Sequence, residues 1–332
     1  MSSPTEGIVL RAISGVYTVQ CERSDALDGQ AGHVVHCTLR GNLKKEFRYS
    51  TSASFAKRVT RAKRPHTTDT ISVGDRVRFV ESRQGSGVIE EIMPRRSRFT
   101  RSGFRGREQT VVCNLDQLFV VFACAEPRPD PWKVDRFLAA IESEELPAII
   151  LANKADIVGE TGHAEVFDEW QRVGYRVLAT SATANTGIDL LREELKGKVS
   201  AFVGPSGVGK SSLLNAVQPG LRLRTAEIGY VTFKGKHTTT ATQLIPLLSG
   251  GWVADTPGLR QLDLIAMDRE ELLECFPEFR GLQGRCRFDD CRHDKEPDCA
   301  IKKAVESEGA SRRRYESFLA LATEAEAKRR VP

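Results

Sequence analysis

The stretch VSAFVGPSGVGKSSLLNAV, residues 199–217, decides the fold of the central part of this chain. It starts with a short apolar run, continues with a glycine-rich loop and ends with SSLLNAV, which reads as a helix. The loop fits G-x-x-x-x-G-K-[ST], and a strand before it and a helix after it are the context in which that pattern binds phosphates. A glycine-rich turn that caps a helix is the alternative, but the two flanks make it rare. The stretch therefore predicts a nucleotide-binding α/β domain.

The residues of this loop have separate expected roles. Gly204 and Gly209 let the backbone wrap closely around phosphates, while successive N–H groups and the helix N-terminus supply positive potential. Lys210 is expected to reach the β- and γ-phosphates and to act in catalysis, and the Ser211 hydroxyl to bind Mg²⁺. The predicted nucleotide contacts of the loop are Gly204, Pro205, Ser206, Gly207, Val208, Gly209, Lys210, Ser211 and Ser212.

A second motif, NKAD at residues 153–156, follows the apolar run AIILAN. Asp156 can accept two hydrogen bonds from guanine N1–H and its 2-amino group, a donor pair that adenine lacks. Lys154 is expected to lie along the base plane. A further strand ends in Thr180-Ser181-Ala182, where a backbone N–H can meet guanine O6. Each match alone is as easily a turn, but together they predict guanine contacts from Asn153, Lys154, Ala155, Asp156, Ser181 and Ala182.

The sequence DTPG at residues 255–258 follows the short apolar run GWVA. An Asp at a strand end can hold Mg²⁺ through a water molecule, and the Gly258 N–H can sense the γ-phosphate. We therefore expect Asp255 and Gly258 to contact the nucleotide. Upstream, GKHTTT at residues 235–240 offers the hydroxyls of Thr238, Thr239 and Thr240. One of the three is expected to complete the Mg²⁺ shell, and Thr239 is taken as the candidate, although the sequence does not distinguish it from its neighbours.

The residue that orients the attacking water is not evident from these motifs. Leu259 follows DTPG where Ras-type GTPases carry a Gln, so unaided hydrolysis is expected to be slow. His237, just before the threonine run, is the candidate catalytic residue. A switch histidine without a catalytic task is the equally weighted alternative.

From about residue 110 continuous apolar strands alternate with amphipathic helices, which indicates a parallel sheet covered on both faces. Ligands bind beyond the carboxyl ends of such strands, where every motif falls. Ordinary GTPases carry the phosphate loop before the guanine motif, whereas here NKAD comes first. This order is a cyclic rearrangement. Because the termini of α/β domains lie at the surface and often close together, a permutation can preserve the sheet.

Short β-branched segments punctuated by glycine occupy residues 7–21, 33–41, 71–80 and 87–94. Four or five strands in this span favour a small β-barrel of the OB type, whose face often binds nucleic acid, although the strings also fit an SH3-like barrel. Two clusters, AKRVTRAKR and PRRSRFTRSGFRGR, are dense in Arg and Lys within a chain of net charge +5. They fit a polyanion partner about as well as a solvated surface.

The composition, with 40% hydrophobic and 28% charged residues, is that of a globular protein. No run approaches the roughly 18 apolar residues that a membrane span needs, and the N-terminus lacks the pattern of a secretory signal. We therefore expect a cytoplasmic protein with no membrane partner, and a monomer.

The C-terminal part contains a potential metal site. Three cysteines and one histidine form a Cys₃His set that suits structural Zn²⁺ and leaves no open coordination position. Such a site would staple a segment with little apolar content. The remaining cysteines are expected to be non-ligands. The predicted ligands are Cys286, Cys291, His293 and Cys299.

A helix is expected near residues 310–329. Its residues Arg312, Arg313 and Arg314 would add basic surface for RNA or form a solvated helix face.

These motifs, NKAD, GPSGVGKSS, HTTT, DTPG and the Cys/His cluster, resemble the RsgA (YjeQ) family of circularly permuted bacterial GTPases over nearly the whole chain. The resemblance implies an OB-fold, a zinc-binding domain, rRNA binding, and GTP hydrolysis stimulated by the small ribosomal subunit during its late maturation. We expect three domains: an OB-type RNA-binding barrel (1–97), a circularly permuted P-loop GTPase domain (98–265) and a mainly helical zinc-binding domain (266–332).

Three alternatives stay open at this stage. An ATPase is disfavoured by Asn153 and Asp156, and an RNA-binding structural protein with a degenerate nucleotide site is disfavoured by intact Lys210, Ser211 and Asp255. A GTPase of the same fold that acts on a non-ribosomal partner is the third.

Overall fold

The computed structural model describes residues 4–22, 32–40, 71–82, 85–102, 108–221, 242–255 and 267–329. The chain divides into two compact units, and each combines segments that are distant in the sequence. Unit 1 comprises Met1–Asp116, Leu195–Ala201 and Arg222–Pro257, and unit 2 comprises Gln117–Glu194, Phe202–Leu221 and Gly258–Pro332.

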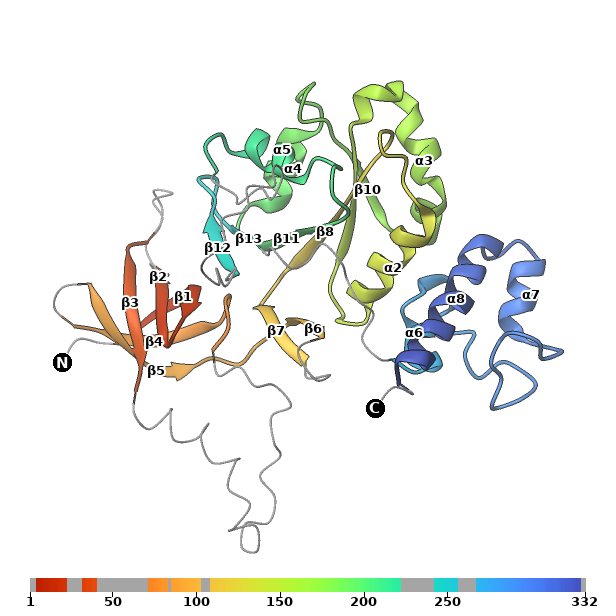
Figure 1. The fold of residues 1–332 in the computed structure, drawn as a ribbon, viewed down its shortest axis with the longest axis horizontal. Helices are drawn as coiled ribbons and strands as arrows, with labels where there is room; N and C mark the ends of the chain where they lie inside the picture. Colours follow the sequence, from red (N-terminus) through yellow and green to blue (C-terminus); the bar gives the residue numbers. More distant parts are fainter. Residues whose placement is uncertain are drawn as a thin grey trace, which may run out of the picture. The chain divides into compact units, whose positions relative to one another are not determined.

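A five-stranded barrel forms the N-terminal part of unit 1 (Figure 1). Its strands are β1 (Thr5–Ile13), β2 (Val16–Cys21), β3 (Val34–Leu39), β4 (Arg76–Glu81) and β5 (Ser86–Ile92). β1 pairs with β2 and β4, β2 pairs with β3, and β4 pairs with β5, all antiparallel, whereas β3 and β5 are parallel. The sheet closes on itself through β1. The barrel is therefore OB-like, which confirms the favoured prediction over the SH3-like alternative.

The barrel core follows from the period-2 alternation of its strands. In β3, Val35 and Cys37 are fully buried, whereas Val34 and His36 point outward and are exposed. Close packing also requires Gly7 in β1, because a Cβ atom there would lie 2.6 Å from the carbonyl oxygen of Gln20. The other core residues include Val9, Val19, Val77, Phe79 and Ile89.

The remaining strands of unit 1 extend beyond the barrel. β12 (Gln243–Pro246) and β13 (Trp252–Asp255) form an antiparallel hairpin, β12 pairs with β1, and β13 pairs in parallel with the start of β11 (Val199–Val203). β6 (Arg98–Ser102) and β7 (Glu108–Cys113) form a second hairpin, which the sequence analysis missed. The run RSRFTRS is interpreted from the sequence as a charge cluster, because it contains too few apolar residues to show the alternation typical of a strand.

In unit 2 the strands β8 (Gln117–Ala123), β9 (Ala148–Asn153) and β10 (Arg176–Ala179) are parallel, in the order β10-β9-β8. All seven residues of β8 are buried, as expected of a strand covered on both faces. The connecting helices are α2 (Pro131–Glu142), α3 (Gly159–Val173), α4 (Ile188–Leu195) and α5 (Lys210–Val217). Gly174, the residue after α3, takes a left-handed conformation with φ of 109° and terminates the helix. The predicted alternation of strands and helices is confirmed.

The C-terminal part of unit 2 is mainly helical, as predicted, and holds α6 (Arg269–Glu274), a 3₁₀ turn η4 (Pro277–Phe279), α7 (Ala300–Glu306) and α8 (Arg312–Arg329). Phe276, Phe279 and Phe318 form its apolar centre, with Phe318 packed edge-on against the other two rings. Among the helices of the described ranges, none combines the length and the hydropathy that crossing a bilayer requires.

The three consecutive arginines at the start of α8 differ in their surroundings. Arg312 is exposed, Arg313 is half-buried, and Arg314 is only 1% exposed. Arg314 pairs with the carboxylates of Asp135 and Glu278. The expectation of a basic surface or a solvated face is therefore wrong for Arg314, because buried carboxylates neutralise it.

Candidate functional site

The phosphate loop connects the end of β11 to the start of α5. Gly204 is required by a close contact: with φ of 141°, it would place a Cβ atom 2.2 Å from the carbonyl oxygen of Val121. The Lys210 side chain folds back over the loop, and its Nζ donates hydrogen bonds to the carbonyl oxygens of Gly204 (2.8 Å) and Pro205 (2.5 Å). Ser211 is half-buried on the first turn of α5. The loop thus carries an ammonium group, which can pair with phosphates, next to a hydroxyl, whose oxygen can bind Mg²⁺.

Asn153, the last residue of β9, is joined directly to this loop. It is 2% exposed, and its Nδ2 donates a 2.7 Å hydrogen bond to the carbonyl oxygen of Val208. Gly209 is required beside it, because a Cβ atom there would lie 2.4 Å from the same Nδ2. The NKAD motif and the phosphate loop, predicted separately from the sequence, are therefore parts of one site.

The other residues of NKAD lie on a 3₁₀ turn, η3 (Ala155–Ile157). Lys154 has a left-handed conformation with φ of 56°, and its Nζ donates a hydrogen bond to the carbonyl oxygen of Glu126, in the loop after β8. The Asp156 side chain is exposed. An exposed carboxylate at the end of a buried strand is accessible to the edge of a base.

The segment after β10 contacts the same turn. The Thr180 carbonyl oxygen accepts a hydrogen bond from Ala155 N at 3.1 Å, and the Thr180 hydroxyl donates to Asn153 Oδ1 at 3.2 Å. Ser181 is buried and its Oγ accepts from Ala184 N at 3.0 Å, while Ala182 is half-buried. From the sequence, Thr180 is identified only as part of a strand end. Its hydroxyl could have been foreseen as a partner for a buried Asn side chain, which needs several hydrogen bonds.

The residues predicted for Mg²⁺ and for hydrolysis are only partly within the described ranges. Asp255 ends β13 in unit 1, and its Oδ2 accepts a 3.5 Å hydrogen bond from Gln243 Nε2. His237, Thr239 and Gly258 lie outside the described residues.

A cluster in unit 2 can hold a metal ion. The donor atoms of Cys286, Cys291, His293 and Cys299 all lie within 4.8 Å of one another. The Sγ atoms of Cys286 and Cys299 are 3.8 Å apart, and each lies 3.5 Å from His293 Nδ1. The four residues predicted as ligands are therefore brought together by the fold.

Burial and backbone contacts prepare this cluster for a metal. His293 is 5% exposed, and burial lowers the pKa of its imidazole, which favours the neutral ring that metal binding requires. The Tyr315 hydroxyl donates a 2.6 Å hydrogen bond to the His293 carbonyl oxygen. The cysteines predicted as non-ligands, Cys21, Cys37, Cys113, Cys124 and Cys275, are all buried and lie outside this cluster.

Comparison with known proteins agrees with this geometry. Residues 92–265 match the family model described as RsgA GTPase. The protein named "Small ribosomal subunit biogenesis GTPase RsgA" of Gemmatimonas aurantiaca is 40% identical over 98% of both chains, and its namesake of Moorella thermoacetica is 41% identical over 98% of this chain and 99% of the relative.

Two solved structures are similar over the same length. YjeQ from Thermotoga maritima has a TM-score of 0.75 at 33% identity, with 97% of this chain and 99% of that chain covered. YloQ, described as a circularly permuted GTPase, has a TM-score of 0.71 at 29% identity, with 98% and 96% covered. The chain therefore belongs to the RsgA GTPase family and is a GTP-hydrolysing enzyme whose motifs follow one another in circularly permuted order.

Proposed function

We propose that this enzyme binds the small ribosomal subunit and its rRNA, and that this subunit stimulates its GTP hydrolysis during late maturation of the subunit. The names of its relatives support this proposal, since each is called a small ribosomal subunit biogenesis GTPase. The Asn153–Val208 hydrogen bond supports the nucleotide part, because it joins the guanine motif to the phosphate loop. A ribosomal partner agrees with the expected cytoplasmic location.

In the proposed site the base and the phosphates are held by different segments. The Asp156 carboxylate accepts from guanine N1–H and the 2-amino group, Lys154 covers the base plane, and Ala182 N–H meets O6. Asn153 holds the two loops together. The phosphate contacts are those predicted from the sequence, Gly204, Pro205, Ser206, Gly207, Val208, Gly209, Lys210, Ser211 and Ser212, and Ala155 and Ser181 line the base.

We propose that Mg²⁺ would be held by the Ser211 hydroxyl, by Asp255 through water and by Thr239, and that the Gly258 N–H would contact the γ-phosphate. When bound, Mg²⁺ would supply positive charge that stabilises the transferred phosphoryl group. Lys210 would stabilise the negative charge of the same group, since its ammonium group lies over the phosphate loop, where it contacts the carbonyl oxygens of Gly204 and Pro205. His237 is proposed to orient the attacking water, since Leu259 has no hydrogen-bonding group.

We propose that the metal at the Cys/His cluster is one structural Zn²⁺. Tetrahedral zinc with Zn–S bonds of about 2.3 Å and Zn–N bonds of about 2.0–2.1 Å places two sulfur atoms about 3.8 Å apart and sulfur and nitrogen about 3.5 Å apart. The separations of 3.8 Å between Cys286 and Cys299 Sγ, and of 3.5 Å from each to His293 Nδ1, have these values. Four protein ligands leave no position for a substrate.

We retain the domain limits 1–97, 98–265 and 266–332, and propose that the barrel and the C-terminal domain of a monomer contact rRNA. The decisive experiment measures GTP and ATP hydrolysis by the purified chain, alone, with small ribosomal subunits and with large subunits as the control. We expect slow GTP turnover that rises at least about tenfold with small subunits only, and no comparable ATP turnover.

The outcomes separate the parts of the proposal. GTP turnover that neither subunit changes would leave the GTPase intact and support a non-ribosomal partner. Stimulation by both subunits would indicate non-specific RNA activation, and equal turnover of ATP would contradict the guanine site.

A further inference from the structure

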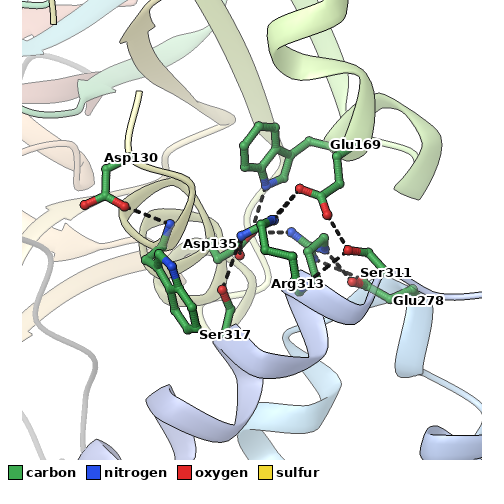
Figure 2. A network of polar contacts seen from close by, with 10 residues as sticks. Asp130, Asp135, Glu169, Glu278, Ser311, Arg313 and Ser317 are labelled. Carbon is green, nitrogen blue, oxygen red and sulfur yellow. Dashed lines mark hydrogen bonds and ion pairs between the residues drawn. The ribbon is translucent and has the colours of Figure 1, made fainter. Parts of the chain in front are cut away.

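The first turns of α8 contact two different parts of unit 2. Figure 2 shows Ser311, which precedes α8, and Arg313 and Ser317 of α8 beside Asp135 of α2 and Glu169 of α3. α2 and α3 belong to the nucleotide-binding part of the unit. Tyr315 of the same helix instead contacts the metal cluster, where its hydroxyl donates a hydrogen bond to the backbone carbonyl oxygen of His293. One short helical segment therefore lies between the two functional parts.

Asp135 is the centre of the contact with α2. Its side chain is fully buried and accepts hydrogen bonds from three side chains: from Trp170 Nε1 at 2.7 Å, from Arg314 Nη1 at 2.5 Å, and from Arg313 Nη1 at 2.6 Å and Nη2 at 3.4 Å. A buried carboxylate is stable only when such donors compensate its lost hydration. Asp135 therefore requires α8 in its present position.

Besides Asp135, Arg313 and Arg314 each contact a second carboxylate, and the two carboxylates belong to different elements. Arg314 also pairs with Glu278 of η4, with its Nη2 3.0 Å from Glu278 Oε2, so it bridges α2 and the C-terminal part. Arg313 Nε donates to Glu169 Oε2 at 2.6 Å, and the Ser311 hydroxyl donates to the other oxygen of Glu169 (Figure 2). Docking of α8 is thus fixed by charged groups whose geometry is specific.

The metal-binding loop is held by the same helix. Tyr315 donates to the carbonyl oxygen of His293, a predicted ligand that has a left-handed φ of 60°. Near the other end of α8, Glu326 accepts from Arg292 Nη2 at 2.7 Å and from Arg269 Nε at 2.9 Å, and Arg292 adjoins His293. Residues from both ends of α8 therefore contact His293 or its neighbour Arg292.

We propose that residues 311–315 couple metal binding at the Cys/His cluster to the docking of α8 on α2 and α3. The inference rests on the proposal that the cluster binds Zn²⁺. A bound metal that fixes His293 also orders Tyr315, which adjoins Arg314 on a rigid helix. Metal binding therefore lowers the free-energy cost of docking α8, and docking lowers the free-energy cost of metal binding. Such a coupling is reciprocal: docking strengthens metal binding by the same factor by which metal binding strengthens docking.

The first test measures Zn²⁺ affinity of the full chain by competition with a chromophoric chelator. Arg314→Met removes the bridge to Asp135, and Arg312→Met, at the neighbouring exposed arginine, is the matched control. We expect Arg314→Met to weaken Zn²⁺ binding by at least about fivefold and Arg312→Met to leave it within twofold. Tyr315→Phe, which removes the hydroxyl from the His293 carbonyl, is expected to weaken it about tenfold. If Arg314→Met does not fold, Glu169→Gln, which keeps the Asp135 contacts, replaces it.

The second test follows hydrogen exchange of α2 and α3 in the wild-type chain with and without Zn²⁺. We expect metal removal to raise exchange in peptides that contain Asp135 and Glu169, but not in the barrel strands. Equal Zn²⁺ affinity in the Arg314 and Arg312 variants, or unchanged exchange in α2 and α3 after metal removal, would overturn the coupling. A purified wild-type chain without bound Zn²⁺ that also fails to bind it would overturn the zinc assignment itself, and the coupling with it.

Discussion

The side-chain amide of Asn153 donates a 2.7 Å hydrogen bond to the backbone oxygen of Val208. The two residues are 55 positions apart in the chain, and each belongs to a motif with its own predicted role. In a permuted chain the guanine motif comes before the phosphate loop, so the order of the motifs cannot show that they meet. We infer from this contact that Asn153 positions both halves of the proposed nucleotide site.

Replacement of Asn153 by Ala should weaken GTP binding by about 10- to 100-fold, because a buried hydrogen bond lost in this way costs about 1–3 kcal/mol. Both the Val208 carbonyl and the Thr180 hydroxyl would lose their partner. Titration with a fluorescent GTP analogue measures the effect. Asn215→Ala, at an exposed asparagine of α5, is the control and should bind normally. Equal affinity of the two variants would exclude the positioning role.

Replacement of Asp156 by Asn should change which base is bound. An amide presents one acceptor and one donor, so it pairs poorly with the two donors of guanine but matches the N–H and C2 carbonyl of xanthine. We expect GTP affinity to fall by about 100-fold and xanthosine triphosphate to bind more tightly than GTP, since an unpaired donor is costly. Competition between the two nucleotides measures this preference. A variant that still prefers GTP would show that Asp156 does not contact the base edge.

Replacement of His237 by Ala tests the hydrolytic role. We expect the subunit-stimulated rate to fall by about 100-fold, a typical contribution of a proton-transferring or water-orienting group, while GTP affinity stays nearly unchanged. Single-turnover hydrolysis with small ribosomal subunits measures the rate, and His163→Ala, on α3, is the control. An unaltered stimulated rate would remove His237 from the mechanism.

Local sequence patterns predicted most of the fold. The apolar run AIILAN coincides with β9, and the Cys/His spacing gave the metal cluster, because these features depend on neighbouring residues. Contacts between distant residues were not visible. A run of three arginines reads as surface, since arginine is rarely fully buried unless it is paired. The partners of Arg314, Asp135 and Glu278, lie 179 and 36 positions away, so only the fold reveals them.

The basic cluster at residues 94–107 illustrates the same limit and leads to a test. Arg95 forms two 2.7 Å hydrogen bonds with the fully buried carboxylate of Asp75, which also accepts from Ser72 N at 2.7 Å. Arg96 instead pairs with Asp116 at 3.1 Å and its side chain is 63% exposed. We therefore expect Arg95 to stabilise the fold, and Arg96, whose side chain is exposed, to be the one that a polyanion can contact.

Replacement of Arg95 by Ala should reduce the free energy of unfolding by about 3 kcal/mol, because it leaves the Asp75 carboxylate buried without a counter-charge. Arg96→Ala, the matched control, should change it by less than about 1 kcal/mol, as exposed pairs contribute little. Urea unfolding of the full chain, followed by circular dichroism in the far ultraviolet, measures both. RNA affinity is expected to show the opposite pattern: under conditions in which both variants are folded, Arg96→Ala should lose more affinity for RNA than Arg95→Ala. Equal stability of the two variants would mean that the Asp75 charge is compensated by groups other than Arg95.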